Sequence, residues 1–413
     1  KGAALVVAPT SVCNNWFSEC QRFAPNLRPI FYRGKERAAL LDNIQAQDLL
    51  ICSYGLLQQD ASLFQAKHWS SIVLDEAQAI KNSQAKRTKA AYQLQGDFRL
   101  ITTGTPVENH LGELWSLFRF LNPGLLLSSD KFSQRFQTPI ERDSDYNARQ
   151  HLKRLVQPFI LRRTKNQVLQ ELPSRTEITL QISLGDGERA LYEAIRQQAL
   201  EALEKDSDSE KDAGHLEVLA QITRLRLASC HPKLVMPDSE LPSGKLQALQ
   251  ELVTELLENQ HKALIFSQFV KHLALIKAWL DQQGILYHYL DGSTPQEKRQ
   301  EAVEAFQRGD RDIFLISLKA GGFGLNLTAA DYVIHMDPWW NPAVEDQASD
   351  RAHRIGQQRP VTIYRLVAEN TIEEKIVRLH QQKRDLADSL LEGSDVSGKL
   401  SSQEMMNMIR DEV

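Results

Sequence analysis

The sequence is poor in cysteine, with four in 413 residues, and it lacks any apolar run long enough to span a membrane. No two cysteines form a C-x-x-C pair, so we expect reduced thiols, and neither disulfide bonds nor a zinc site. No signal peptide is visible. We expect an intracellular protein with no membrane partner, in the cytoplasm or nucleoid of a prokaryote or the nucleus of a eukaryote. The cysteines are Cys13, Cys20, Cys52 and Cys230.

The chain also lacks a large excess of charge of either sign. Its formal net charge is −4, which excludes a uniformly basic nucleic-acid binder and limits any such surface to a local patch. With 413 residues, of which 42% are hydrophobic, the chain is too long for a single core, and two or three domains are expected. It opens without a methionine, directly in a strand-like run, so we expect it to be a piece of a longer protein.

A third absence concerns nucleotide binding. The pattern G-x-x-x-x-G-K-[ST], whose backbone amides and lysine hold nucleotide phosphates, occurs nowhere in the chain. Gly-Lys pairs at residues 34–35 and 244–245 lack the upstream glycine and are followed by Glu36 and Leu246. Any nucleotide site in these residues therefore lacks its usual phosphate-binding loop.

Residues 1–122 alternate short apolar strands with amphipathic helices, which predicts a parallel sheet with helices on both faces. Ligands bind such sheets beyond the carboxyl ends of the strands, and polar residues follow the predicted strands there. The expected strands are Ala3–Ala8, Arg28–Tyr32, Leu49–Cys52, Ser71–Leu74 and Arg99–Thr102. The polar ends are Pro9-Thr10, Ser53-Tyr54, Asp75-Glu76 and Thr103-Gly104-Thr105.

Asp75 and Glu76 end one of these strands and are the candidate catalytic acids. Adjacent carboxylates can divide the work of phosphate hydrolysis: Asp75 would hold Mg²⁺ through water, and Glu76 would polarise the water that attacks a γ-phosphate. An isolated acid pair after a strand more often stabilises a helix N-terminus. The two residues alone leave both interpretations open.

The second candidate region is residues 313–357. We expect strands at Ile313–Ser317 and Tyr332–Met336, a glycine-rich turn at Lys319–Gly324, and a helix from about Pro342. Helical spacing places four residues on one outward face, so that two guanidiniums point into solvent, and four on a core face. The outward residues are Gln347, Asp350, Arg351 and Arg354, and the core residues are Val344, Ala348, Ala352 and Ile355.

This arginine-bearing helix has two interpretations. A solvated face with pairing of Asp350 to Arg354 is the simpler one. A glycine turn followed by a rigid helix with two arginines instead suits recognition of a polyanion. The region then needs a partner lobe with a metal-binding acid, which Asp75 and Glu76 supply.

Four segments together resemble the Snf2 family of superfamily 2 helicase-type ATPases. They are DEAQ at 75–78, TGTPVEN at 103–109, GGFGLNLTAAD at 321–331 and QASDRAHRIGQ at 347–357. The resemblance extends over nearly the whole chain, and the last of the four segments is highly specific. The resemblance implies an α/β fold of two RecA-like lobes with parallel sheets flanked by helices, plus helical insertions, that closes on ATP and Mg²⁺. It also implies that the phosphate-binding loop lies just before residue 3.

The resemblance divides the chain into five parts. The first lobe, without its phosphate-binding segment, takes residues 1–122; a helical protrusion and linker 123–176; a helical insertion of the second lobe 177–242; the second lobe 243–368; and a brace helix with a tail 369–413. Further strands are expected at Glu177–Leu184, Ala263–Phe266, Leu286–Leu290, Ile313–Ser317, Tyr332–Met336 and Thr362–Leu366.

The resemblance also implies roles for individual residues, according to their positions in the matching segments. Arg351 and Arg354 match the family's arginine fingers, which stabilise charge on the transferring phosphoryl group. Residues matching positions beside the nucleotide are Gln347, Gly324 and Gly104. Residues matching positions near the DNA track are Thr10, Lys81, Arg99, Ser267, Lys319 and Gly321.

Trp340 corresponds to a family tryptophan that approaches the minor groove, and a buried loop anchor is the equal alternative. The neighbouring Trp339 departs from the usual family pattern, which leaves open which ring meets DNA. His353 is expected to pack beside the site rather than to act as a base.

The function implied is an ATP-dependent motor that translocates along double-stranded DNA and displaces or remodels bound protein without separating the strands. RNA polymerase or another DNA-bound protein is the candidate partner. The alternative is a module that binds DNA or RNA polymerase without hydrolysis, which a degenerate phosphate loop upstream would favour. Both acids and both arginines count against that alternative.

The first prediction concerns these 413 residues by themselves. Without a phosphate-binding loop, affinity for ATP and ordering of Mg²⁺ both suffer. A phosphate-release assay should therefore find little or no ATP hydrolysis by this chain, with or without DNA. Robust DNA-stimulated turnover would contradict the prediction.

Overall fold

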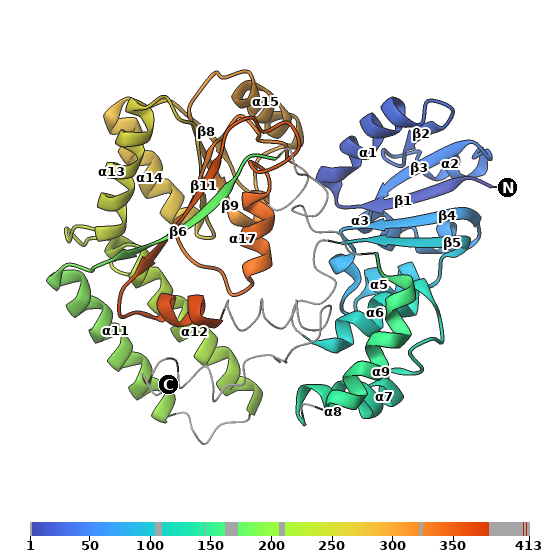
Figure 1. Ribbon diagram of the computed structural model, residues 1–413, viewed down its shortest axis with the longest axis horizontal. Coiled ribbons are helices and arrows are strands. Elements are labelled where there is room, and N and C mark those ends of the chain that lie inside the picture. The colour runs from blue at the N-terminus through green and yellow to red at the C-terminus, as the bar shows by residue number, and fades with distance from the viewer. Residues whose placement is uncertain are drawn as a thin grey trace. The chain divides into compact units, whose positions relative to one another are not determined.

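The computed structural model describes residues 2–103, 110–143, 145–161, 172–205, 211–321, 325–379, 408 and 410. These residues belong to two compact units, one ending at residue 161 and the other starting at residue 172. Each unit is built on one parallel β-sheet with helices packed against it (Figure 1). The predicted α/β fold class is therefore confirmed. In this part of the chain, no helix has the length and apolar character needed to cross a membrane.

The sheet of the first unit has five parallel strands in the order β2-β3-β1-β4-β5. All five were expected from the sequence. β4 and β5 begin earlier than predicted because His68 pairs with Gln95, and Trp69 with Gly96, before the apolar runs start. The strands are β1 (Ala4–Ala8), β2 (Arg28–Phe31), β3 (Asp48–Ser53), β4 (His68–Asp75) and β5 (Gln95–Thr102).

Both faces of this sheet are covered. Leu5 and Val7 of β1 face a core shared with Leu57 and Phe120, and Val6 between them is buried on the opposite face, as expected for a strand inside a doubly covered parallel sheet. The helices are α1 (Thr10–Phe23), α2 (Ala38–Asp42), α3 (Tyr54–Gln59), α4 (Ala61–Gln65), η1 (Ala77–Ile80), α5 (Lys86–Tyr92) and α6 (Leu111–Leu121).

A smaller helical cluster continues from α6 and has its own apolar core. Trp115 and Phe118 of α6 pack there with Phe132, Phe136 and Leu152. The further elements are α7 (Ser129–Phe132), the π-helical turn η2 (Ser133–Gln137), α8 (Thr138–Glu141), α9 (Tyr146–Val156) and η3 (Gln157–Phe159).

The sheet of the second unit has six parallel strands in the order β6-β11-β10-β7-β9-β8. All six strands were expected, and β6 joins this sheet beside β11, although the sequence placed it in a helical insertion. The limits of the five predicted parts stay a prediction. The strands are β6 (Arg175–Ile182), β7 (Ala263–Ser267), β8 (Tyr287–Leu290), β9 (Ile313–Ser317), β10 (Tyr332–His335) and β11 (Val361–Ala368).

Two separate cores cover the faces of this sheet. Leu264 and Phe266 of β7 face a core that includes Ala348, and Ala263 and Ile265 face the core on the opposite side. The helices are α11 (Asp186–Lys205), α12 (Lys211–Cys230), η4 (Pro232–Leu234), α13 (Gly244–Glu258), α14 (Val270–Gln283), α15 (Gln296–Gln307), α16 (Leu318–Gly321), α17 (Pro342–Ser349) and a helical stretch at 372–379.

A buried ion pair ties the 372–379 helix to the second sheet. Lys245 Nζ lies 2.6 Å from Glu373 Oε2, and both side chains are fully buried. Lys245 also donates to the carbonyl of Met336 after β10 (2.8 Å), and Glu373 accepts the N–H of Ala368 in β11 (2.9 Å). Every charged atom of the pair thus has a partner, which a charge buried this deeply requires.

Removing one member of this pair should destabilise the second unit strongly. Glu373→Leu leaves the Lys245 ammonium buried without its counter-charge, at a cost of about 3–5 kcal/mol. Hydrogen–deuterium exchange of peptides from β7 and β10 reports on this unit alone. The joint change of Lys245→Met and Glu373→Leu should recover much of the loss, because it leaves no unpaired charge.

Asp312→Ala is the matched control for Glu373→Leu. Asp312 pairs with Lys262 at the surface, and its carboxylate is 53% exposed, so its loss should cost less than about 1 kcal/mol. Equal effects of the two substitutions on exchange would contradict the account.

Candidate functional site

Polar residues gather at the carboxyl edge of the first sheet. Because β3, β1, β4 and β5 are parallel neighbours, their carboxyl ends share one edge. Ser53 ends β3, Thr10 follows β1, Asp75 ends β4 and Thr103 follows β5. This shared edge is as the sequence predicted, and the predicted nucleotide residue Gly104 lies outside the described residues.

Three donors from separate segments hold the Asp75 carboxylate. Trp16 of α1 donates its indole N–H to Oδ2 at 2.7 Å, and Thr102 donates its hydroxyl to Oδ1 at 2.6 Å. The backbone N–H of Glu76 also donates to Oδ1, at 2.9 Å. Tyr54 donates its phenol to the Asp75 carbonyl at 2.8 Å, and burial raises the pKa of Tyr54. The carboxylate is thus fixed by the protein itself.

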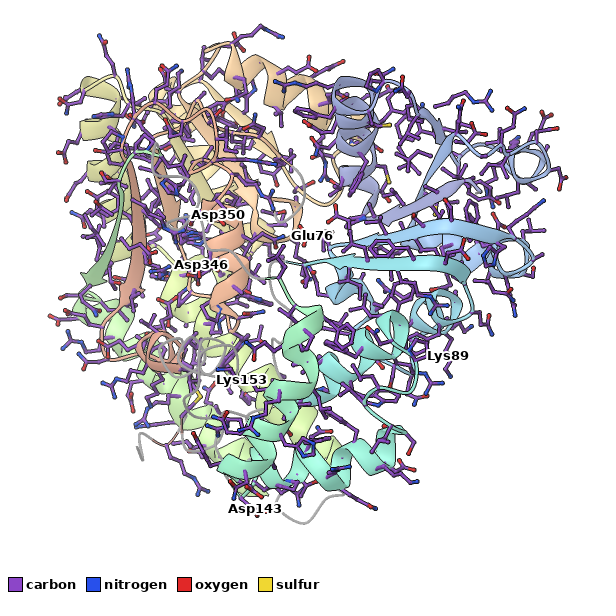
Figure 2. All side chains as sticks on the ribbon, turned by 45° about the vertical axis from the view of Figure 1, so that its right-hand side comes forward. Glu76, Lys89, Asp143, Lys153, Asp346 and Asp350 are labelled. Atoms are coloured by element: carbon purple, nitrogen blue, oxygen red, sulfur yellow. The ribbon has the colours of Figure 1, made fainter. Side chains whose placement is uncertain are left out.

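Glu76 has a left-handed backbone, with φ 49° and ψ 53°. This conformation is uncommon outside glycine, and such residues concentrate at functional sites. Its Oε2 accepts from the side-chain amide of Gln78 at 2.7 Å, and Gln78 in turn accepts from the Thr103 hydroxyl at 3.1 Å. The two adjacent acids therefore have different partners, and Figure 2 shows Glu76 at the end of the first sheet.

The surroundings of Asp75 fit a Mg²⁺ ion held through water. An ionised carboxylate offers about four acceptor directions, and protein donors use three of them. Asp75 is partly exposed, so a hydrated ion can approach it and share a water molecule rather than a direct bond. Mg²⁺ suits this arrangement because it sheds its water reluctantly.

The glycine-rich segment of the second unit differs from the prediction. Residues 318–321 form the short helix α16 and not a turn. Gly321 is required there by packing, because a Cβ would lie 2.5 Å from Cε1 of Phe266. Lys319 is exposed on this helix, and the predicted nucleotide residue Gly324 lies outside the described residues.

The predicted helix from Pro342 to Ile355 is wrong beyond Ser349. α17 ends there, with Asp350 as its C-cap, so Arg351 and Arg354 follow the helix instead of lying on it. At the end of the helix the Arg351 N–H donates to the Ala348 carbonyl at 3.1 Å instead of to Gln347, and the Arg351 carbonyl accepts the N–H of Leu327 at 3.0 Å. Gln347 lies on the helix as predicted.

The predicted faces of this segment are partly wrong as well. Arg351 is only 8% exposed, so its guanidinium does not project freely into solvent as expected, whereas Arg354 is partly exposed. Ala348 and Ala352 are fully buried as predicted, but Ile355 is 70% exposed. The early end of α17 turns Ile355 away from the core face that an unbroken helix would have given it.

Carboxylates of α17 anchor this segment to its own sheet. Glu345 is fully buried; its Oε2 accepts from Arg365 Nε at 2.6 Å, and its Oε1 accepts the N–H of Trp339 at 2.7 Å. Burial raises the pKa of Glu345, and Arg365 opposes that shift. Arg175 of β6 donates to Asp346 at 3.1 Å and to Asp350 at 3.2 Å.

Figure 2 shows Asp346 and Asp350 on and just after α17. His353 packs as expected, with Nε2 2.9 Å from the Pro173 carbonyl. Arg175 and Glu345 were not among the site residues predicted from the sequence. The three acids at 345, 346 and 350 stand close together in the sequence and could have indicated ion pairs. Their arginine partners could not be identified, because they are distant in the chain.

The residues predicted near DNA fall into two groups. Thr10 and Lys319 are exposed. The other polar groups are used within the protein: Arg99 donates to the carbonyls of Phe120 (2.8 Å) and Leu94 (2.7 Å), Ser267 is buried against Asp337, and Lys81 lies 3.5 Å from Glu113. Their contacts with DNA stay a prediction.

Trp340 is half buried beside the guanidinium of Arg226. That guanidinium lies 5.5 Å from the ring centroids of Trp339 and Trp340 and 5.4 Å from that of Phe269, and Arg226 donates to the Pro338 carbonyl at 2.5 Å. α12 is thereby joined to the loop before α17. Both interpretations of Trp340, a loop anchor and a minor-groove contact, stay open.

Two family models match most of the chain. The SNF2-related domain matches residues 1–234, and the helicase conserved C-terminal domain matches residues 244–356. Both candidate acids lie in the first match, and Arg351 and Arg354 lie in the second.

Named relatives match nearly the full chain. A Bacillus subtilis protein, YwqA, whose name describes an ATP-dependent helicase/translocase, is 38% identical over 97% of this chain and 44% of its own. Human SWI/SNF-related matrix-associated actin-dependent regulator of chromatin subfamily A member 1 is 35% identical over 99% and 41%. The SWI2/SNF2 ATPase core of Sulfolobus solfataricus in complex with dsDNA is 34% identical over 98% and 84%, with a TM-score of 0.47. The chain spans less than half the length of the first two.

The anchoring of α17 makes Arg175 a testable support of the arginine segment. Arg175→Ala removes the donor shared by Asp346 and Asp350, so residues 342–357 should exchange amide hydrogens about three- to tenfold faster, equivalent to roughly 1 kcal/mol for a partly exposed pair. Hydrogen–deuterium exchange measures this directly. Arg308→Ala is the control, since its guanidinium is 71% exposed and pairs only with Glu304 of the same helix face. Unchanged exchange at 342–357 in Arg175→Ala would contradict the assignment.

Proposed function

Because the chain belongs to the Snf2 family of helicase-related ATPases, we propose that the protein containing it hydrolyses ATP in response to double-stranded DNA. The observation that supports this most is the local structure of the two adjacent acids, Asp75 and Glu76. Asp75 is immobilised by three donors, and Glu76 follows it in a strained backbone conformation. A pair that merely caps a helix would need neither feature.

The two acids have separate tasks in the proposed reaction. Asp75 would hold a hydrated Mg²⁺ that neutralises charge on the ATP phosphates. Glu76 would accept a hydrogen bond from the attacking water and orient it toward the γ-phosphate. The Trp16 and Thr102 hydrogen bonds keep Asp75 in its place while the charges on the phosphates change, so little reorganisation is needed.

The proposed electrophilic partners are Arg351 and Arg354. Both follow α17, whose carboxylates are tied to Arg175 and Arg365. A guanidinium that stabilises a transition state must be held in position beforehand, and the fixed carbonyl of Arg351 contributes to that. We propose that both arginines reach the γ-phosphate when the lobes close on ATP, which couples hydrolysis to lobe movement.

Movement along DNA is the proposed outcome of that coupling. A motor that steps over arbitrary sequence needs contacts to phosphates rather than to bases, and exposed Thr10 and Lys319 are suited to such contacts. The net charge of −4 limits any DNA-binding surface to a local patch. We propose translocation along double-stranded DNA that displaces or remodels bound protein, with RNA polymerase as one candidate target.

A triplex-displacement assay on the full-length protein tests this proposal. It should release the third strand only with ATP and Mg²⁺, and should not open a forked duplex. Glu76→Gln should lower ATP turnover and strand release by at least about 100-fold, because the attacking water loses its acceptor. Arg354→Ala should lower both about 1,000-fold or more, as loss of an arginine finger does.

One control variant and two alternative outcomes complete the test. Glu36→Gln changes an exposed glutamate of the same unit and should leave both rates unchanged. ATP hydrolysis without strand release in the parent protein would contradict translocation while leaving the ATPase assignment intact. DNA binding with no hydrolysis would favour the non-hydrolysing alternative.

A further inference from the structure

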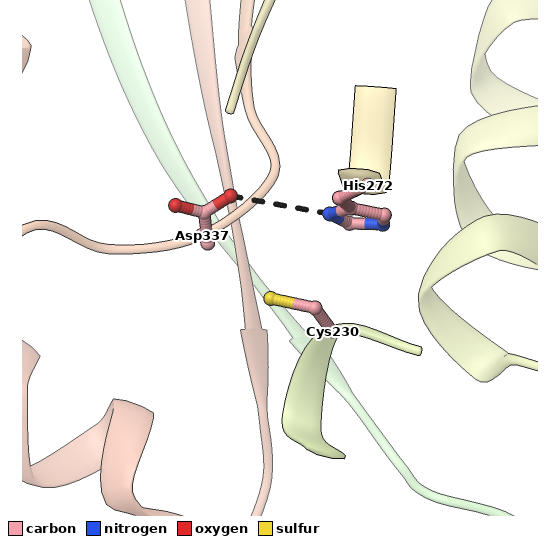
Figure 3. Close-up of side chains that lie close together, drawn as sticks. All are labelled: Cys230, His272 and Asp337. Atoms are coloured by element: carbon pink, nitrogen blue, oxygen red, sulfur yellow. Dashed lines mark ion pairs between the residues drawn. The ribbon is translucent and has the colours of Figure 1, made fainter. Parts of the chain in front are cut away.

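Three ligand-type side chains converge inside the second unit. Cys230 is the last residue of α12, His272 lies in the first turn of α14, and Asp337 follows β10. Their sulfur, nitrogen and oxygen atoms all lie within 4.8 Å of one another, and all three side chains are buried (Figure 3). The ATPase proposal assigns them no role.

His272 is the most unusual member of this cluster. It is fully buried, and neither ring nitrogen has a hydrogen-bond partner within the described part of the chain. Its Nδ1 lies 4.0 Å from Asp337 Oδ2, which is too long for a hydrogen bond. A buried imidazole is normally satisfied by a donor or acceptor, so this one lacks a partner that its surroundings should supply.

A divalent metal ion needs only a slightly shorter separation. Zinc bonds of about 2.0–2.1 Å to nitrogen and oxygen at a tetrahedral angle place two such ligands about 3.4 Å apart, and a bond of about 2.3 Å to sulfur brings in the thiolate. Small side-chain movements of less than about 1 Å would then bring all three atoms to bonding distance.

The remaining neighbours of the cluster resemble an outer shell. The Asp337 carboxylate accepts from the backbone N–H of Gln268 at 3.2 Å and from the Ser267 hydroxyl, which together fix its orientation. Glu373 Oε1 lies 3.8 Å from the Cys230 sulfur and pairs with Lys245. Such contacts orient metal ligands and tune their basicity.

Charge balance also suits a divalent ion. A thiolate and a carboxylate carry two negative charges, which Zn²⁺ neutralises, and the adjacent pair of Lys245 and Glu373 is neutral by itself. A buried cluster with no net charge avoids the desolvation cost of an uncompensated ion. The mixed sulfur, nitrogen and oxygen donors favour zinc over Mg²⁺ or Ca²⁺, which prefer oxygen alone.

We propose that Cys230, His272 and Asp337 form a structural site for a zinc-class divalent cation. The ion would join α12, α14 and the loop that leads to α17, three segments that are distant in the sequence. This site departs from the expectation drawn from cysteine spacing, because its ligands come from segments that no local motif connects.

Cobalt titration of metal-free full-length protein tests the proposal with the metal alone as probe. Tetrahedral thiolate-bound Co²⁺ gives a near-ultraviolet sulfur-to-cobalt charge-transfer band and intense visible bands. We expect one equivalent of such a signal, bleached by Zn²⁺. Cys230→Ala should abolish the charge-transfer band, and Asp337→Asn should weaken cobalt affinity by about 100-fold or more while keeping the fold.

Cys52→Ala is the matched control, because Cys52 is as deeply buried as Cys230 but lies in the first unit. It should leave the cobalt spectrum unchanged. Circular dichroism of every variant identifies loss of folding, and Asp337→Asn decides the outcome if Cys230→Ala unfolds. The proposal is overturned if no thiolate band forms, or if the band persists in Cys230→Ala. Either result would leave a direct interaction of the His272 ring with Asp337 as the explanation.

Discussion

Within each sheet, all strands of the described part of the chain run parallel, and the positions of the candidate site residues follow from this. The carboxyl ends of parallel strands lie on one edge of the sheet, so polar residues that follow different strands meet there. In the first unit this edge gathers Asp75, Glu76 and their hydrogen-bond donors. In the second it places the α16 segment after β9 and the loop before α17 after β10, on either side of the end of β7. The chemistry is therefore located by topology before any single side chain is considered.

Buried charge then gives these edges their rigidity. The first unit fixes Asp75 with neutral donors, Trp16 and Thr102, which leave its negative charge available to a hydrated cation. The second unit instead uses ion pairs, Glu345 with Arg365 and Lys245 with Glu373, in which each charge is cancelled locally. Each ion pair holds two elements together and adds no net charge to the unit. The two units thus use charge differently. The first leaves the Asp75 carboxylate without a paired cation, and the second uses paired charges to hold the arginine-bearing segment in place.

Much of this architecture could be predicted from the sequence, because strand positions and polar strand ends depend on local patterns. The end of α17 could not, since the residues after it are held by distant partners: Leu327 donates to the Arg351 carbonyl, and Arg175, 175 residues from Asp350, donates to the Asp350 carboxylate. Helical periodicity carried through residues 350–355 therefore misplaced Ile355 and Arg351. The cluster of Cys230, His272 and Asp337 was missed for the same reason. Its members are brought together by packing, and no spacing rule describes them.

We propose that Glu76 and Arg354, which belong to different units, act on the same ATP molecule. A double-mutant cycle on DNA-stimulated kcat of the full-length protein tests it most directly, with Glu76→Gln, Arg354→Ala and both together. Residues that serve one transition state are strongly non-additive. The account predicts that the double variant is at most a few-fold slower than the slower single variant. If the two reductions multiply, the residues act independently and the claim is wrong.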